Sequence, residues 1–582
     1  MPTLEWIGKD KVINHHLDVP YRVLERKYSY DEAGQHAEDN GSENMIIHGD
    51  NLDALKSLLP RYEGRVKCIY IDPPYNTGNE KWVYNDNVND PRILKWLGQV
   101  VGAEGEDLSR HDKWLCMMYP RLKLLQRLLA DDGVIFISID DVECANLKLI
   151  CDEIFGSNCF VSNISWQRTY STRNDSKGIV NEVEHILCYS KQPAWNPSKL
   201  ARTEEMDALY RSPDGDERPW ASDNPFAPGA ATHPGMVYAI QHPITGGLLY
   251  PPNGRCWTYG QDQMLRIMLE WSFYELRPID DYEKRVSICG QSETVPKEIN
   301  AIMLAGRWED LFPRAVQRYQ IGHWPALYFT SGGKGGIRKK TYLDDVSGKP
   351  PTNYWPYDDA GHTDEAKKLL KAIFGGQSPF DTPKPPRLIE RILQIASDPD
   401  SVILDSFAGS GTTAHAVLNM NKADGGHRRF ILVEMMDYAD SITAERVKRV
   451  IDGYGSGRQA VEGTGGSFSY YELGESLMIG DVLNESIGVD KIREYVYFTD
   501  TKSRLPEAHE DEPYYLGLHV NNAYYFYYER EAVTTLNREF LHTIKTKADA
   551  YVIYADLCTL SEEELQKYHI TFKKIPRDIT KL

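Results

Sequence analysis

Two parts of the chain alternate short apolar runs with apolar residues at helical spacing. In residues 41–190, MIIHGDNLDALKSLL predicts a strand, a turn and a helix, and VKCIYID predicts a short buried strand. Further along, DKWLCMMYPRLKLLQRLLADDG predicts a helix that ends at its glycine, and GVIFISID predicts another buried strand. In residues 376–464, KPPRLIERILQIA and AGSGTTAHAVLNM predict helices that alternate with the strands SVILDSF and RRFILVEM. This alternation predicts an α/β fold with a parallel sheet covered on both faces.

The other three parts of the chain follow different patterns. Residues 1–40 are polar with few periodic apolar positions, and we expect them to form an extended N-terminal arm. Residues 191–375 are rich in Pro, Gly, Trp and Tyr, and their short, irregular elements indicate an insertion between the two α/β parts. Residues 465–582 contain SFSYYEL, NAYYFYYERE, ADAYVIYADL and HITFKKI, which predict the strands of a small α+β domain, a candidate for docking a partner.

Composition narrows the class of protein. With 582 residues, 41% hydrophobic and 26% charged, the chain has the size of about three or four globular domains. It has no run of about 18 apolar residues that would span a membrane, and its N-terminus lacks the layout of a signal peptide. The nine cysteines form no CxxC pair, so we expect neither a zinc site nor a disulfide framework, and the cytoplasm fits. The net charge of −19 argues against a nucleic-acid partner when taken alone, but it does not exclude a local basic groove.

The first chemical motif, Asp72-Pro73-Pro74-Tyr75, follows the predicted strand VKCIYI, at the edge where parallel sheets bind their ligands. Its two prolines fix the backbone and remove two N–H donors, so the carbonyl groups there are held rigidly and are free to accept. The Asp72 carboxylate and a rigid carbonyl together offer two acceptors to one NH2 group, and Tyr75 offers a ring on which a base can stack. The motif therefore favours recognition of an exocyclic amine on a nucleobase over a simple strand-end turn.

The second motif, DSFAGSGTT, follows the strand SVIL and opens a helix. Gly409 and Gly411 allow a tight turn and close approach of a ligand, but the run matches neither the GxGxxG fingerprint nor a Walker loop, so phosphate binding is disfavoured. Glu434 ends the next predicted strand, where a carboxylate either accepts both hydroxyls of a ribose or is simply solvated. Asp50, in the turn HGDN, either accepts from an adenine amine or caps the following helix.

DPPY together with FAGSGTT resembles an S-adenosylmethionine-dependent amino-methyltransferase of DNA. The order of DPPY, a long insertion and then the Gly-rich turn resembles the β-class enzymes, in which the insertion is the target-recognition domain. The wider match, through HGDNLDALKSL, IYIDPPYNTG, RLKLLQRLLADDGVIFISIDD, PKPPRLIERIL and GGHRRFILVEM, is to the Mod subunits of type III restriction-modification systems. The resemblance covers residues 44–190 and 350–445 well, and it implies a doubly wound, Rossmann-like sheet with one antiparallel edge strand.

The resemblance also implies roles for single residues and no metal. The Pro73 carbonyl is an acceptor, and Tyr75 stacks on the target base. The implied catalytic residues are Asp72, Pro73, Pro74 and Tyr75. The implied cofactor-binding residues are Asp405, Phe407, Ala408, Gly409, Ser410 and Gly411 in the Gly-rich turn, Asp50 at the cofactor adenine, Glu434 at the ribose hydroxyls, and Lys384 in the remaining cofactor element.

The implied activity is methyl transfer from S-adenosylmethionine to adenine N6 in duplex DNA. Aspartate at the start of DPPY favours adenine N6, and cytosine N4 is the alternative. A target base inside a duplex must be flipped out, at a cost of about a few kcal/mol. The implied partners are double-stranded DNA, a second copy of the chain and, in a restriction system, a Res-like translocase subunit, because this chain carries no Walker loop.

Basic residues supply candidate DNA contacts. The run SGGKGGIRKK, residues 331–340, predicts a basic glycine-rich loop of the insertion that could follow a phosphate backbone or simply be solvated. The candidate contacts are Lys334, Arg338, Lys339 and Lys340 in this run, with Arg168 and Arg173 of WQRTYSTRND as second candidates.

Two other functions stay open from the sequence. One is a non-catalytic DNA-specificity subunit of a defence complex, although both motifs retain every expected residue. The other is an RNA or protein amino-methyltransferase, although such enzymes usually carry NPPY and place the cofactor motif first.

Overall fold

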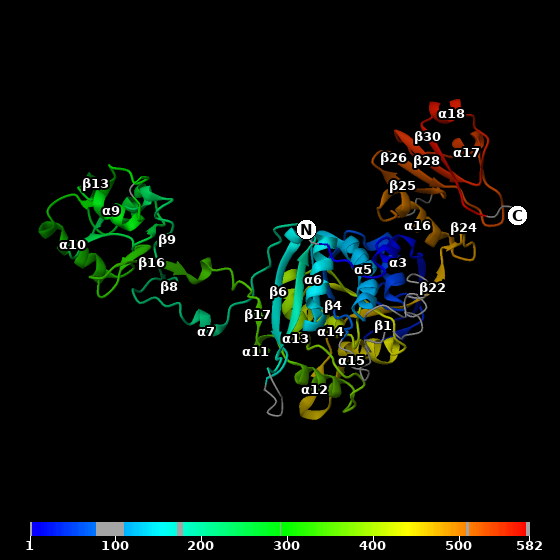
Figure 1. The fold of residues 1–582 in the computed structure, drawn as a ribbon, viewed down its shortest axis with the longest axis horizontal. Coiled ribbons are helices and arrows are strands. Elements are labelled where there is room, and N and C mark those ends of the chain that lie inside the picture. The colour runs from blue at the N-terminus through cyan, green and yellow to red at the C-terminus, as the bar shows by residue number, and fades with distance from the viewer. Residues whose placement is uncertain (1–2, 77–109, 171–178, 292, 508–510, 578–582) are drawn as a thin grey trace. The chain divides into compact units, whose positions relative to one another are not determined.

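The computed structural model describes residues 3–76, 110–170, 179–291, 293–507 and 511–577 (Figure 1). The chain divides into two compact units, of which the first comprises Met1–Ser198 with Pro351–Leu582 and the second comprises Lys199–Pro350. The second unit is thus an insertion into the first. It is shorter than the insertion expected over residues 191–375, because residues 354–373 form a strand and helices of the first unit.

An 11-stranded sheet forms the centre of the first unit. Its neighbouring strands β5, β4, β18, β19, β3 and β22 run parallel. In order across the sheet, the strands are β17 (Tyr354–Trp355), β6 (Phe160–Gln167), β7 (Val183–Ser190), β5 (Leu129–Ile139), β4 (Val66–Ile71), β18 (Val402–Asp405), β19 (Arg429–Glu434), β3 (Met45–His48), β22 (Ser467–Ser476), β1 (Arg22–Asp31) and β2 (Gly34–His36). The two α/β parts of the sequence therefore share one sheet, in which β18 and β19 lie between β4 and β3.

Helices cover both faces of this sheet. Successive strand residues point to opposite faces, and Ile69, Ile137 and Ile431 are buried in one core with α3 (Asn51–Tyr62), α5 (Arg110–Leu128) and α6 (Asp141–Phe155). Their strand neighbours Cys68, Phe136 and Leu432 are also buried, and helices α13 (Pro386–Ala396) and α14 (Thr412–Asp424) contact the strands β4, β5 and β19. The predicted α/β doubly wound fold is confirmed.

The N-terminal segment is not the extended arm that its polar composition predicts. Strand β1 pairs antiparallel with β22, and the rings of Tyr28 and Tyr470 stack with centroids 5.0 Å apart. Before β1, Trp6 and Val12 are buried in the main core. Strand β22 was expected in the C-terminal domain, but it joins this sheet instead. Polar residues interrupt the alternation in β1, so its pairing with a distant strand is not visible in the sequence.

Two further details differ from expectation. Strand β7 is antiparallel to both neighbours but is not at the edge, because β6 and β17 lie beyond it, and β1 is a second antiparallel strand. The helix expected to end at Gly133 ends at Leu128, because Leu129 already pairs with Val66 at the start of β5.

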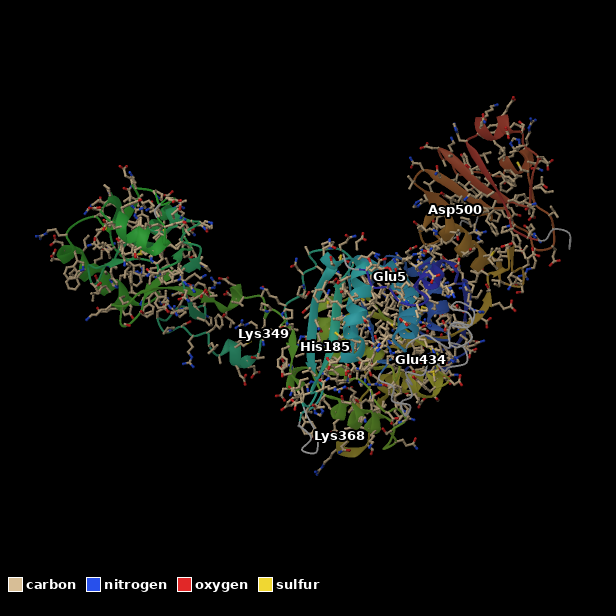
Figure 2. The ribbon with its side chains drawn as sticks, viewed as in Figure 1. Glu5, His185, Lys349, Lys368, Glu434 and Asp500 are labelled. Carbon is tan, nitrogen blue, oxygen red and sulfur yellow. The ribbon has the colours of Figure 1, made fainter. Side chains whose placement is uncertain are left out.

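The C-terminal part of the first unit carries a separate four-stranded sheet. Its strands are β25 (Tyr515–His519), β26 (Asn522–Phe526), β28 (Ala550–Ala555) and β30 (Ile570–Lys574), and the last three coincide with predicted strands. Helix α16 (Val489–Thr501) packs against β25 and β26, which gives the predicted α+β character. Figure 2 shows the side chains of the described residues, with Lys368 pointing outward from α12 (Thr363–Ile373), whereas Glu434 at the end of β19 is buried.

The second unit has small sheets and its own aromatic core. Its sheets have four, three and two strands, and the three-stranded one consists of β15 (Leu327–Phe329), β16 (Ile337–Tyr342) and β8 (Trp220–Asp223). Trp257 and Trp271 are almost fully buried in this core. Across the described ranges of both units, none of the helices combines the length and the apolar character needed to cross a membrane.

Candidate active site

Both motifs lie at the carboxyl edge of the central sheet. Strands β4 and β18 are parallel neighbours, with Cys68 opposite Ile403, so Asp72 after β4 and Asp405 at the end of β18 leave the sheet on the same side. Glu434 ends β19 and is paired with His48 at the end of β3, just before Asp50. Residues far apart in the sequence are therefore gathered where open α/β sheets bind ligands.

Neighbouring side chains fix the DPPY turn. The Trp114 indole N–H donates to the Pro74 carbonyl at 2.6 Å. Within the described part of the chain, no donor occupies the Pro73 carbonyl, so this acceptor stays free. After Tyr75, Asn76 adopts a left-handed φ of 59°, and its side-chain amide donates to the buried carboxylate of Glu143. The backbone conformation and the free carbonyl are thus held in place before any ligand binds.

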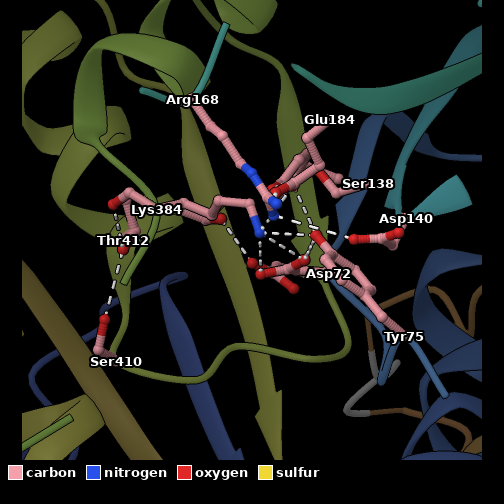
Figure 3. Close-up of polar contacts among 12 residues, drawn as sticks. Asp72, Tyr75, Ser138, Asp140, Arg168, Glu184, Lys384, Ser410 and Thr412 are labelled. Atoms are coloured by element: carbon pink, nitrogen blue, oxygen red, sulfur yellow. Dashed lines mark hydrogen bonds and ion pairs between the residues drawn. The ribbon is translucent and has the colours of Figure 1, made fainter. Parts of the chain in front are cut away.

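A charged network surrounds Asp72 (Figure 3). The Lys384 ammonium donates to Asp72 Oδ1 at 2.8 Å, to Asp72 Oδ2 at 2.7 Å and to the Tyr75 hydroxyl at 2.7 Å. The Tyr75 hydroxyl lies 2.6 Å from both Asp72 Oδ1 and Glu184 Oε1, so it can donate to either. Burial raises the pKa of Tyr75 well above its ordinary value, and the two carboxylates raise it further, so the hydroxyl stays protonated.

A cavity of about 650 Å³ opens beside this network, within the size range of small-molecule sites. It lies entirely in the first unit. Its walls include Asp72, Pro73, Pro74, Tyr75, Arg168, Tyr170, Glu184, His362, Asp364 and Lys384. Tyr75 is only 9% exposed, but it is among the residues that line the cavity. A planar ring system can therefore reach Asp72, Pro73 and Tyr75 together.

The Gly-rich turn is almost fully buried and does not line this cavity. Asp405 Oδ1 accepts from the Phe407 N–H at 3.0 Å, and Oδ2 accepts from the Thr413 hydroxyl at 2.5 Å. Burial raises the pKa of Asp405 to about 7. Gly411 has a φ of 79°, and a Cβ there would lie 3.0 Å from the Thr443 carbonyl oxygen, so the turn requires glycine at this position.

Glu434 supports the same turn. Its Oε2 accepts from the Gly409 N–H at 2.8 Å, and its Oε1 accepts from the Met436 N–H at 3.0 Å. Both carboxylate oxygens thus hold the backbone that follows β18 and β19. Beneath the turn, Arg446 is buried and donates to the hydroxyls of Ser410 at 2.8 Å and Thr412 at 2.7 Å. Burial lowers the pKa of Arg446 to about 9. No motif in the sequence marks Arg446.

Asp50 caps the helix that follows it. Its Oδ1 accepts from the Leu52 N–H at 2.8 Å and the Asp53 N–H at 3.3 Å. The guanidinium of Arg121, which is buried, lies 3.6 Å from Asp50 Oδ2. The contacts within the chain therefore show Asp50 in one of its two expected roles, as a helix cap. An adenine contact through Oδ2 stays a prediction.

The Lys384 side chain contacts the catalytic motif, and its role in cofactor binding stays a prediction. It was expected in the cofactor element, but its ammonium contacts Asp72 and Tyr75 of the catalytic motif. Only its backbone reaches the Gly-rich helix, where the Thr412 hydroxyl donates to the Lys384 carbonyl at 3.2 Å. Glu184 on β7 was not predicted at all, because it lies in the strand sequence VEHILCYS, where no motif marks it.

The candidate DNA contacts separate into three groups. Arg168 lines the cavity, with Nη1 3.7 Å from Glu184 Oε2, and Arg173 lies outside the described residues. In the second unit, Lys334 is exposed, but Arg338 and Lys339 belong to strand β16 rather than to a loop. The prediction that Lys340 contacts DNA is wrong. The Lys340 side chain is fully buried and ion-paired with Asp214 and Asp216, so it is not available to a phosphate.

The comparisons with known proteins cover most of the chain. The Mod subunit of the type III restriction-modification enzyme StyLTI from Salmonella typhimurium is 34% identical over 442 residues, which are 71% of this chain and 58% of that protein. The EcoPI Mod subunit from Escherichia phage P1 is 29% identical over 469 residues, which are 74% of this chain and 63% of that protein. The chain thus spans about three fifths of the length of these curated relatives, and the resemblance to Mod subunits is confirmed.

Among solved structures, the cytosine-N4-specific PvuII DNA methyltransferase matches 70% of this chain and 86% of its own, with 12% identity and a TM-score of 0.30. The model of the DNA methylase family matches residues 66–499, which include both motifs, the insertion and every strand from β4 to β22. The chain therefore belongs to the DNA methylase family.

Proposed function

We propose that the chain transfers a methyl group from S-adenosylmethionine to adenine N6 in duplex DNA, as the modification subunit of a type III-like restriction-modification or related defence system. The observation that carries the proposal is the position of Asp72, the free Pro73 carbonyl and Tyr75 at one cavity wall, directly beside the strand that bears the Gly-rich turn. Membership of the DNA methylase family and the similarity to Mod subunits support it.

The chemistry needs an acceptor for each hydrogen of the target amine. The lone pair of an exocyclic amine is delocalised into the base, which makes the amine a poor nucleophile. When Asp72 and the Pro73 carbonyl accept its two N–H groups, the lone pair becomes localised on nitrogen as attack begins, and Tyr75 keeps the base plane in position. Bound S-adenosylmethionine would supply an electrophilic methyl group on its sulfonium.

The residues at the neighbouring strand ends fit this cofactor. The left-handed glycines of the turn after β18 allow the backbone to approach a ligand closely. Glu434 at the end of β19 is the proposed acceptor for the hydroxyls of a ribose, and Asp50 just after β3 is the proposed acceptor for an adenine amine. Strands β18, β19 and β3 are adjacent, so the Gly-rich turn, the proposed diol acceptor and the proposed amine acceptor follow one another along the sheet edge. An adenosine needs the last two, for its ribose and for its base.

The target base must leave the duplex to reach the cavity beside Asp72. A cavity of about 650 Å³ accommodates one base, but not a base pair with its neighbours stacked on it. Arg168 and the exposed Lys334, together with Arg338 and Lys339, are the proposed phosphate contacts, and Lys340 is excluded from them. We further propose that the chain acts in the cytoplasm as a homodimer and that a Res-like subunit supplies cleavage.

The substitution Asp72→Ala tests this proposal. The wild-type chain, given labelled S-adenosylmethionine and mixed duplex DNA, is expected to form N6-methyladenine, and the variant should lose at least about 10²-fold in kcat while cofactor binding persists. The matched control is Asp132→Ala on β5, because Asp132 also pairs with a lysine, Lys67 at 2.6 Å, but is exposed.

Each outcome of this experiment distinguishes a function. N4-methylcytosine as the product would favour the alternative base. A wild-type chain that binds DNA specifically but transfers no label would favour a non-catalytic specificity subunit, and transfer that persists in Asp72→Ala would remove Asp72 from the mechanism.

A further inference from the structure

Glu184 and Lys384 occupy the centre of the catalytic network, although neither belongs to the DPPY or Gly-rich motif. Glu184 is 5% exposed on β7, and its Oε1 lies 3.1 Å from Lys384 Nζ. Lys384 therefore lies between two carboxylates, those of Asp72 and Glu184 (Figure 3). A second buried acid at this position is not needed to bind an amine, and it requires another explanation.

The Lys384 ammonium occupies the acceptors that the target amine needs. Its hydrogens point to both oxygens of Asp72, at 2.8 and 2.7 Å. Asp72 Oδ1 also lies 2.6 Å from the Tyr75 hydroxyl, so an incoming amine competes with donors already at this carboxylate. Glu184 is already within reach of Lys384 Nζ, so the ammonium can strengthen that contact without becoming an unpaired buried charge.

Resting on the proposed function, we propose that Lys384 keeps Asp72 ionised while the site is empty and shifts toward Glu184 when the target amine binds. Lys384 and Glu184 are then positioning residues for methyl transfer. Without Lys384, two carboxylates would remain close together in a buried site. Without Glu184, Lys384 would have only Asp72 as its carboxylate partner and would compete with the amine.

The surrounding charges agree with this exchange. Burial lowers the pKa of Lys384, but Asp72 and Glu184 raise it to a net value above the ordinary one, so the ammonium persists at neutral pH. The charged and titratable groups that face the two carboxylates are Lys384 before α13, Arg168 after β6, Asp140 after β5, Tyr70 on β4, Asp405 on β18 and Tyr75 in their own turn. Of the two cations, only Lys384 contacts Asp72 directly.

The test is a cycle of three variants, K384M, E184Q and K384M/E184Q. In K384M the two carboxylates should share a proton, so the acid limb of the kcat profile moves to higher pH by about 1 to 3 pH units. In E184Q, kcat should fall about 10-fold or more while cofactor binding is retained, because Lys384 stays on Asp72. The double variant leaves one buried carboxylate, and its acid limb should return toward that of the wild type.

Lys368→Met on α12 is the control, because Lys368 is exposed and pairs with Asp364. A second readout, the protonated-carboxyl band in infrared difference spectra at neutral pH, needs no turnover. We expect the band to grow in K384M relative to wild type and to disappear in the double variant.

The outcomes separate the two proposals. An acid limb that stays in place in an active K384M variant, or a shift that E184Q does not reverse, would overturn this inference alone. A wild-type chain that transfers no methyl group would overturn the proposed function, and the infrared difference would then still decide whether Lys384 keeps Asp72 ionised.

Discussion

Lys384 in the first unit and Lys340 in the second each lie between two acidic side chains. Lys384 in the first unit contacts Asp72 and Glu184, and Lys340 in the second contacts Asp214 at 2.6 Å and Asp216 at 2.7 Å. Their surroundings differ. Lys384 forms part of the wall of a cavity of about 650 Å³, whereas the Lys340 side chain is fully buried with its ammonium 5.1 Å from the Trp220 ring.

The contrast shows that the surroundings of an ion triad decide its role. Beside a cavity, a ligand can replace one partner of the lysine, so the triad can take part in binding. In a packed core, the same groups can only hold the chain together. Burial tends to raise the pKa of Asp214, but hydrogen bonds from Lys340 and Trp220 lower it below its ordinary value. Among the described residues, Asp405 has hydrogen bonds but no cation partner, and burial raises its pKa to about 7.

The largest expected effect comes from breaking the ion triad of Lys340, Asp214 and Asp216 in the second unit. Lys340→Met leaves Asp214 buried without a cation, and we expect the free energy of opening of this unit to fall by about 3 to 5 kcal/mol. Hydrogen exchange of amides in residues 199–350 of the full chain measures it. Lys339→Met on the same strand is the control. Lys339 is half-buried, and its ion pair with the exposed Asp223 is longer, at 3.4 Å, so this variant should lower the free energy of opening by less than about 1 kcal/mol. Equal losses in the two variants would contradict a structural role specific to Lys340.

A smaller effect on stability is expected from the titration of Asp405. Because the pKa of Asp405 is raised in the folded chain, the folded state binds a proton that the unfolded state releases between about pH 4 and pH 7. Stability should therefore fall as pH rises through this window, by up to about 4 kcal/mol, and stay level above it. Asp405→Asn keeps an acceptor for the Phe407 N–H and should remove this dependence. Urea unfolding of wild type and variant across pH measures it, and parallel curves would show that Asp405 does not titrate there.

The smallest effect concerns the other basic residues of the run 331–340. Replacing Lys334, Arg338 and Lys339 together by glutamine should weaken DNA binding and reduce its salt slope by about one per lost phosphate contact. The second unit has 18 Lys and Arg against 19 Asp and Glu, whereas the whole chain has 66 against 85, so this unit opposes DNA least. Affinity measured over a range of salt concentrations tests it. An unchanged slope would remove these side chains from the DNA surface.

Part of the site could be predicted from the sequence because its chemistry is local. Asp72, Pro73 and Tyr75 are consecutive, and their residue types fix a rigid acceptor turn wherever the strand VKCIYI ends. The Gly-rich turn is equally local, since Gly411 is required by its own φ of 79°. Asp50 was ambiguous, because the same carboxylate suits a cap and a ligand, and only the contacts with Leu52 and Asp53 distinguish them.

The sequence by itself determined the α/β rhythm of the strands, the two turns and the insertion between them, because each depends on residues that are neighbours along the chain. The tertiary structure alone decided which charges meet. Lys384 reaches Asp72 because β18, which follows α13, lies beside β4. Lys340 is buried because β16 pairs with β8, near Asp214. Electrostatic pairing depends on distance in space, and a linear pattern of charged residues carries no information about that distance until the strands are in register.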